Sequence, residues 1–181
     1  MTLLGELDVL RVVSQRLDTA GIEYMLTGSY ALAYYATPRM TRDLDLVVAL
    51  TDRDVDSIST IFSADFYVDA DDVLTAIQSQ RMFNLMHLGS GIKLDFIVRK
   101  TSEYRQVEFA RRQRVDLGDV PLWITSREDL ILSKLVWAKD SGSELQRRDA
   151  RSLIDASVDR AYMQQWAHRL DVATDLAEIM R

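Results

Sequence analysis

The sequence predicts a mixed α+β fold, in which a β-sheet is flanked by helices and followed by a C-terminal helical part. Residues 44–50 and 92–99 are apolar and of strand length, and residues 82–88 alternate apolar with polar side chains. Residues 3–20 carry apolar side chains at the spacing of a helix instead. Because residues 126–181 are helical in pattern, we expect a core over residues 1–125 and a helical subdomain packed on it.

The N-terminal part predicts a helix, a strand and a second helix. The helix over residues 3–20 ends at Gly21, a residue suited to a helix C-cap. A short strand over 22–27 then passes through a tight turn at Gly28 into a short helix, with Ser29 as its expected N-cap. Free backbone N–H groups at such a helix start, together with the helix dipole, favour a phosphate. Gly28 and Ser29 are therefore candidates for binding one.

The rest of the chain predicts short elements before the helical part. A hairpin is the clearest of these, because residues 82–88 and 92–99 flank the turn signal Gly89-Ser90-Gly91. Ser126 to Asp129 form a capping box that opens a helix to about residue 139. The remaining predicted elements are a helix over 51–62, a strand near 66–68, helices over 71–80 and 102–113, a hairpin over 115–124, a helix from residue 144, and two short helices around Trp166 and Leu176.

The composition is that of a globular protein with one core. The chain has 181 residues, of which 48% are hydrophobic and 28% charged, and these values exclude disordered and fibrous classes. It contains no cysteine, which excludes disulfides and thiolate chemistry and favours a cytoplasmic location. We expect no signal peptide and no membrane span, because no segment has either pattern. The net charge of −6 argues against a long electrostatic track along nucleic acid.

Three aspartates lie at the predicted central strands. Successive side chains of a strand point to opposite faces, so Asp43 and Asp45 share one face and Leu44 takes the other. Two such carboxylates repel each other and are costly to desolvate unless a cation neutralises them. Asp95, a lone acid in the later apolar strand, completes a three-carboxylate cluster if the two strands pair. The pattern predicts a magnesium site for phosphoryl or nucleotidyl transfer, with these three acids as metal ligands.

Several basic residues leave alternatives open. Arg39 and Arg42, in the loop before the paired acids, either hold a triphosphate or pair with the acids. The denser basic region within residues 99–114 is either a solvated helix face or a docking surface for an RNA or nucleotide-bearing substrate. Lys134 and Asp149, on the apolar sides of two helices joined by a short loop, either form an ion pair or each point into a catalytic cleft.

The pattern Gly28-Ser29, Asp43-x-Asp45 and a third acid at Asp95 resembles the nucleotidyltransferase superfamily of DNA polymerase β. This resemblance implies a nucleotidyltransferase catalytic core over residues 1–125, with Mg²⁺ as cofactor and an NTP as substrate. In such a mechanism two Mg²⁺ ions lie between the paired acids and the triphosphate, while Asp95 serves the metal that activates the acceptor hydroxyl.

A second set of residues, Glu128-Asp129-Leu130, Lys134-Leu135 and Arg148-Asp149, resembles C-terminal motifs of the AbiEii-type nucleotidyltransferases and related bacterial proteins. It implies that Lys134 contacts the nucleotide phosphates and that Asp149 orients the nucleotide or assists proton transfer. The implied acceptor is an RNA, protein or small-molecule hydroxyl, and the implied partner is an antitoxin if the protein is a toxin. The alternatives are a non-catalytic protein of this fold that acts as a binding or antitoxin-like partner, and an aminoglycoside-modifying transferase.

Overall fold

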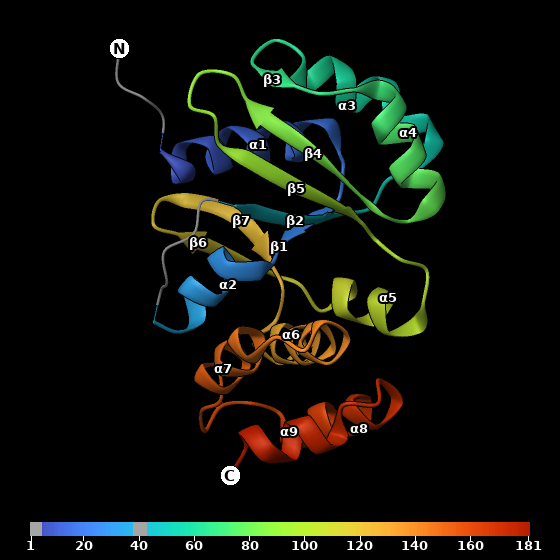
Figure 1. Ribbon diagram of the computed structural model, residues 1–181. Helices are drawn as coiled ribbons and strands as arrows, with labels where there is room; N and C mark the ends of the chain where they lie inside the picture. The colour runs from blue at the N-terminus through green and yellow to red at the C-terminus, as the bar shows by residue number, and fades with distance from the viewer. Residues whose placement is uncertain (1–4, 38–42) are drawn as a thin grey trace.

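The protein is built on one mixed β-sheet with helices on both faces, as the sequence predicts (Figure 1). The structure is a computed structural model that describes residues 5–37 and 43–181. Arg39 and Arg42, whose role the sequence leaves open, lie outside these ranges. The elements are α1 (Glu6–Ala20), β1 (Tyr24–Leu26), α2 (Gly28–Tyr35), β2 (Leu44–Val48), the 3₁₀-helix η1 (Asp52–Asp54), α3 (Val55–Phe62), β3 (Phe66–Tyr67), α4 (Ala70–Ser79), β4 (Met82–His87), β5 (Lys93–Val98), α5 (Glu103–Ala110), β6 (Gln113–Leu117), β7 (Val120–Ile124), α6 (Arg127–Ser141), α7 (Glu144–Ser152), α8 (Arg160–Arg169) and α9 (Ala173–Ile179).

The sheet of the described residues has the strand order β3-β4-β5-β2-β1-β7-β6. β2 and β5 are parallel, β1 and β7 are parallel, and the other neighbouring strands are antiparallel. The predicted hairpins of β4 with β5 and of β6 with β7 are both confirmed. Because β2 and β5 are direct neighbours near the middle of the sheet, the two strands that carry the acids lie side by side.

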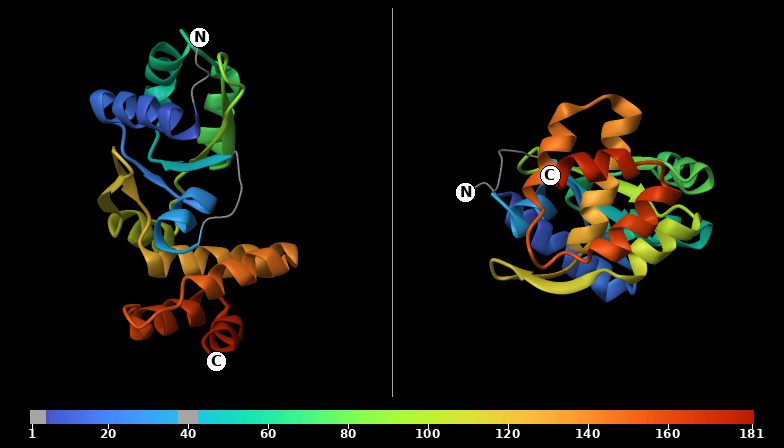
Figure 2. Two further views of the ribbon diagram at one scale, coloured as in Figure 1. Left: turned by 90° about the vertical axis from the view of Figure 1, so that its left-hand side faces the viewer. Right: turned by 90° about the horizontal axis from the view of Figure 1, so that it is seen from below.

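Different helices cover the two faces of the sheet. Figures 1 and 2 show α1 and α3 on one side, and α2, α5 and α6 to α9 on the other. The face toward α1 and α3 is apolar: Leu44 and Leu46 are fully buried, and Phe62 of α3 packs edge-on against Phe96 of β5 with ring centroids 5.8 Å apart. Since alternate residues of β2 are buried in this core, Asp45 lies on the opposite face.

Local sequence signals set the helix boundaries, with one correction. Gly21 is the C-cap of α1, as predicted, and has the left-handed φ of 68°. Helix α2, however, begins at Gly28, and Thr27 with its extended backbone is the N-cap. The prediction of Ser29 as N-cap is therefore wrong, because the helix begins two residues earlier than such a cap requires and places Ser29, which is buried, within the first turn.

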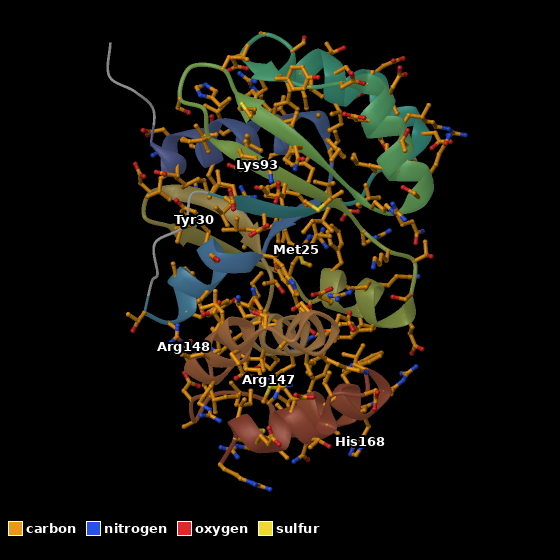
Figure 3. The ribbon with its side chains drawn as sticks, in the orientation of Figure 1. Met25, Tyr30, Lys93, Arg147, Arg148 and His168 are labelled. Carbon is orange, nitrogen blue, oxygen red and sulfur yellow. The ribbon has the colours of Figure 1, made fainter. Side chains whose placement is uncertain are left out.

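Buried polar contacts hold the C-terminal helices together. The predicted capping residue of α6 is confirmed, because the Ser126 hydroxyl accepts a hydrogen bond from the backbone N–H of Asp129 at 3.1 Å. The fully buried Asp129 carboxylate also accepts a bond from the Tyr162 hydroxyl of α8 at 2.6 Å. Arg147 of α7, labelled in Figure 3, pairs with Asp175 near the start of α9 at 2.8 Å. None of the described helices is long and apolar enough to cross a membrane.

Candidate active site

The parallel pairing of β2 and β5 places two of the predicted acids side by side. Asp45 is the direct register partner of Asp95, so both side chains leave the sheet on the same face. Asp43 lies immediately before β2, is exposed, and acts on Asp45 through its charge. The strand pairing that a three-carboxylate cluster requires is therefore present.

The charges of this cluster are only partly balanced. Burial, followed by the charges of Asp95 and Asp43, raises the pKa of Asp45 to about 6. Asp95 has closer support, because its Oδ1 atom lies 2.8 Å from Nζ of Lys93 and accepts a 2.5 Å hydrogen bond from the Asn84 amide. Figure 3 labels Lys93 in the sheet. Asp95 therefore has a cation and an amide as direct partners, while the pKa of Asp45 shows the effect of the repulsion.

The chemistry of these three side chains fits a hard divalent cation. Carboxylate oxygens are preferred ligands of Mg²⁺, and a cation among them would relieve the repulsion that raises the pKa of Asp45. In their present rotamers, however, the described residues contain no group of three or more acids or histidines arranged to hold a metal ion. Metal binding by Asp43, Asp45 and Asp95 stays a prediction.

Gly28 makes room for the carboxylate of Asp45. A Cβ atom added to Gly28, whose φ is 64°, would lie only 2.0 Å from Oδ2 of Asp45. The two segments are also joined through the main chain, because the Thr27 N–H donates to the Asp45 carbonyl at 2.9 Å. The turn into α2 and the acid-bearing strand therefore form one unit, which only glycine allows in this geometry.

We expect Gly28→Ala to destabilise the fold more than an alanine substitution at a glycine that has the same left-handed backbone but no close neighbour. Gly118→Ala is the matched control, since Gly118 has a φ of 65° and nothing within 4 Å of an added Cβ. The extra loss at Gly28 should be about 1–3 kcal/mol, because the added methyl group must displace the Asp45 side chain. Urea unfolding of both variants measures this difference. Equal losses at the two positions would mean that the contact with Asp45 is not a constraint.

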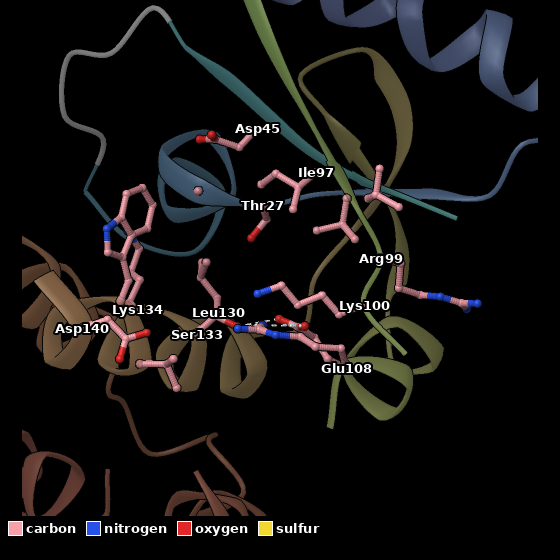
Figure 4. Close-up of a pocket in the computed structure, with 16 residues that line it drawn as sticks. Thr27, Asp45, Ile97, Arg99, Lys100, Glu108, Leu130, Ser133, Lys134 and Asp140 are labelled. Atoms are coloured by element: carbon pink, nitrogen blue, oxygen red, sulfur yellow. Dashed lines mark hydrogen bonds and ion pairs between the residues drawn. The ribbon is translucent and has the colours of Figure 1, made fainter. Parts of the chain in front are cut away.

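A pocket of about 300 Å³ lies beside Asp45, between the sheet and α6 (Figure 4). Figure 4 shows Asp45, Thr27 and Ile97 on the sheet side and Lys134 and Asp140 on the helix side. This volume is at the lower end of the range for sites of small molecules. Asp45 and the basic residues of the pocket therefore line one cavity and can act on one ligand.

Lys134 and Asp149 form an ion pair in the buried junction of α6 and α7. The Nζ and Oδ2 atoms are 2.9 Å apart, and the two side chains are 4% and 7% exposed. Lys134 also donates to the side-chain oxygen of Gln146 at 3.0 Å. Of the two predicted alternatives, the ion pair is present, while Lys134 at the same time lines the pocket that contains Asp45. Asp149 therefore holds a lysine that faces the site.

Most of the predicted basic region is engaged in ion pairs within the protein. The arginines of this region that follow residue 100 each contact an acid, so their charges are compensated within the protein. Their pairs are Arg105 with Glu108 at 2.7 Å, Arg111 with Asp129 at 3.1 Å, Arg112 with Glu23 at 2.5 Å, and Arg114 with Asp18 at 2.9 Å. Of the upstream members of the region, Arg99 lies over the ring of Phe109 at 5.1 Å, which leaves Lys100 for the alternative role at the pocket.

The structure adds residues that the sequence analysis does not assign to the site. Lys93 shares a face with Asp95 because it lies two residues earlier in the same strand, a signal that the period of two already contains. Asn84 requires the register of the hairpin, which places it directly opposite Asp95. Trp137, the residue after Val136 on α6 and 55% exposed, lines the pocket through tertiary packing alone.

The raised pKa of Asp45 predicts a pH-dependent cost in stability. A carboxyl whose pKa is higher in the folded than in the unfolded chain stabilises the fold at low pH, and this contribution is lost as the pH rises toward the folded pKa of about 6. In EDTA, Asp45→Asn should therefore raise the free energy of unfolding by roughly 2–3 kcal/mol at pH 7.5 and by far less near pH 4. Urea unfolding at both pH values measures the gain.

Asp116→Asn, at an exposed position of β6, is the control for this experiment. It should change the stability by less than about 0.5 kcal/mol at either pH, since it relieves no cluster of acids. A gain from Asp45→Asn that is equal at pH 4 and pH 7.5 would show that the carboxylate charges do not repel each other as described.

The fold is similar to that of solved nucleotidyltransferases. ANT(2'')-Ia in complex with adenylyl-2''-tobramycin aligns with a TM-score of 0.63 and 12% identity over 92% of this chain and 96% of its own. An antigenic nucleotidyltransferase-like protein from Paracoccidioides brasiliensis aligns with a TM-score of 0.59 and 20% identity over 94% of this chain and 89% of its own. The lincosamide antibiotic adenylyltransferase LnuA, lincomycin-bound, aligns with a TM-score of 0.53 and 13% identity over 84% of this chain and 98% of its own. These similarities define the fold of the chain as a nucleotidyltransferase fold.

The family follows from the sequence of this chain. The model of the family "Nucleotidyl transferase AbiEii toxin, Type IV TA system" matches residues 13–174. Because this match spans most of the 181 residues, the protein belongs to the AbiEii nucleotidyltransferase family. No curated protein sequence matches the chain.

Proposed function

We propose that the protein is a metal-dependent enzyme that transfers a nucleoside monophosphate from an NTP to an acceptor hydroxyl. One observation supports this most directly: Asp45 and Asp95 are register partners on adjacent strands, and a pocket of about 300 Å³ opens next to Asp45. Acids that converge beside a pocket with basic residues match the needs of phosphoryl transfer, which depends on positioning and on charge neutralisation.

Asp43, Asp45 and Asp95 would hold the magnesium ions in this reaction. Bound Mg²⁺ supplies neutralisation of the charge that develops on the phosphate oxygens. Asp45 is suited to this role because burial and two neighbouring acids already disfavour its charge without a cation. Gly28 supports the role, since it leaves the space that the Asp45 carboxylate occupies.

The remaining groups would orient the two substrates. The backbone at Gly28 and Ser29 lies at the start of α2 and approaches the phosphates, and Lys134, held by Asp149, faces them from α6. The acceptor oxygen forms a bond to the α-phosphorus, and the bond from this phosphorus to the bridging oxygen of the β-phosphate breaks. Pyrophosphate leaves, and the carboxylate of Asp95 takes the proton of the hydroxyl.

The acceptor is an RNA, a protein or a small molecule, and the reaction makes the protein the toxin of a toxin–antitoxin pair in the cytoplasm. The family name supports the toxin role. The alternative is a protein of this fold without catalysis that acts as a binding or antitoxin-like partner. The presence of all three acids favours the enzyme, because a binding protein has no need for a costly carboxylate cluster.

Transfer of label from an α-³²P-labelled NTP tests the proposal. The pure protein is incubated with each labelled NTP and Mg²⁺ together with total RNA and cell extract, and the products are separated on a gel. A labelled band that requires the protein supports the enzyme, and nuclease or protease treatment identifies its acceptor. No label from any of the NTPs would favour the protein without catalysis.

A further inference from the structure

The pocket beside Asp45 contains several basic side chains that are already engaged. Lys134 contacts Asp149 and Gln146, and Arg105 contacts Glu108 at 2.7 Å. The guanidinium of Arg99 stands over the ring of Phe109 at 5.1 Å, and Figure 4 shows this side chain extending away from the pocket. Each of these cations therefore already has a partner within the protein.

Lys100 differs from the other basic residues of the pocket. It is exposed, and among the described residues its amine has no ion pair or hydrogen bond. Figure 4 shows its side chain extending into the pocket toward α6, opposite to the direction of Arg99. The ammonium group of Lys100, in the segment after β5, can therefore bind an anion in the pocket.

We infer that Lys100 binds the β- and γ-phosphates of the nucleotide, the two that leave as pyrophosphate. This inference rests on the proposed function. The α-phosphate must lie at the acids, where the new bond forms, whereas Lys100 follows Asp95 by five residues along the strand and its extension. At about 3.3 Å per residue, the base of its side chain is well removed from the acids, so the amine reaches the distal phosphates instead of the reacting one.

Binding of four ligands to Lys100→Met tests this inference by calorimetry in Mg²⁺. The ligands are an α,β-methylene NTP, which cannot be cleaved, the matching NMP, inorganic pyrophosphate and the nucleoside. We expect the affinity for the NTP analogue and for pyrophosphate to fall about 10- to 100-fold, since a charge-assisted contact is lost. The affinity for NMP and nucleoside should not change. Lys100→Arg should retain most of the affinity, because it keeps the charge.

Arg99→Met is the matched control, because it removes a neighbouring cation that points away from the pocket. It should leave all four affinities unchanged, and thermal melting should show both variants folded. Equal losses for NTP analogue and NMP in Lys100→Met, or no loss at all, would overturn the inference while the proposed function stands. If the unmodified protein binds none of the NTP analogues, the proposed function fails and the inference fails with it.

Discussion

Asp45→Asn should lower the rate of nucleotide transfer by at least about 100-fold while the protein remains folded. The amide keeps the size of the side chain and its place against Gly28, but it removes a charge that the metal requires. Because the same change relieves repulsion from Asp95 and Asp43, the variant should be at least as stable as the unmodified protein at neutral pH. Loss of activity would thus not be a consequence of unfolding.

The rate of label transfer, measured beside Asp56→Asn, checks this result. Asp56 is exposed on α3, on the face of the sheet away from the acids, so its substitution should leave the rate unchanged. Full activity in Asp45→Asn, on material shown to be folded, would remove Asp45 from the reaction and with it the metal site.

Lys134→Met should be the most destabilising of the substitutions considered for this protein. It leaves the carboxylate of Asp149, only 7% exposed, without the ammonium 2.9 Å away. Removing one partner of a buried ion pair typically lowers the free energy of unfolding by about 3–5 kcal/mol, and we expect a loss of this size for Lys134→Met. Urea unfolding gives the change in free energy, and the double variant Lys134→Met/Asp149→Leu should recover much of it, because no buried charge remains.

Lys139→Met provides the comparison on the same helix. Lys139 pairs with Asp171 at 2.5 Å, but the two side chains are 39% and 89% exposed, so that the loss should stay below about 1 kcal/mol. If Lys134→Met and Lys139→Met lower the free energy of unfolding by the same amount, burial does not determine how much the Lys134–Asp149 pair contributes to stability. Lys134 is then held by other contacts.

Much of the fold could be predicted because its signals are local. The alternation of Leu44, Asp45 and Leu46 directly gives the buried face of β2 and the face of the acid. The turn Gly89-Ser90-Gly91 likewise predicts the β4–β5 hairpin. The sequence is less reliable for the exact residue at which a helix begins: it favours Ser29 as the N-cap of α2, whereas the N-cap is Thr27, two residues earlier.

The candidate site could be predicted only in part, because its assembly depends on contacts distant in the sequence. That Asp45 stands beside Asp95 requires β2 and β5 to pair in one register out of several. A lysine near an acid in sequence, such as Lys134 before Asp149, does not reveal whether it forms a pair, and the packing of α6 on α7 decides this. Lys100 is one of several neighbouring cations in the sequence, and only the structure separates it from Arg99.

Binding of an uncleavable NTP analogue with and without Mg²⁺ tests most directly whether the three acids form a metal site. We expect calorimetry to detect binding in Mg²⁺ and EDTA to weaken it at least about tenfold, because the carboxylates of Asp43, Asp45 and Asp95 otherwise repel the phosphates. Asp45→Asn should show the same weak binding in both buffers. An affinity of the unmodified protein that is equal in Mg²⁺ and in EDTA would contradict a metal site formed by these acids.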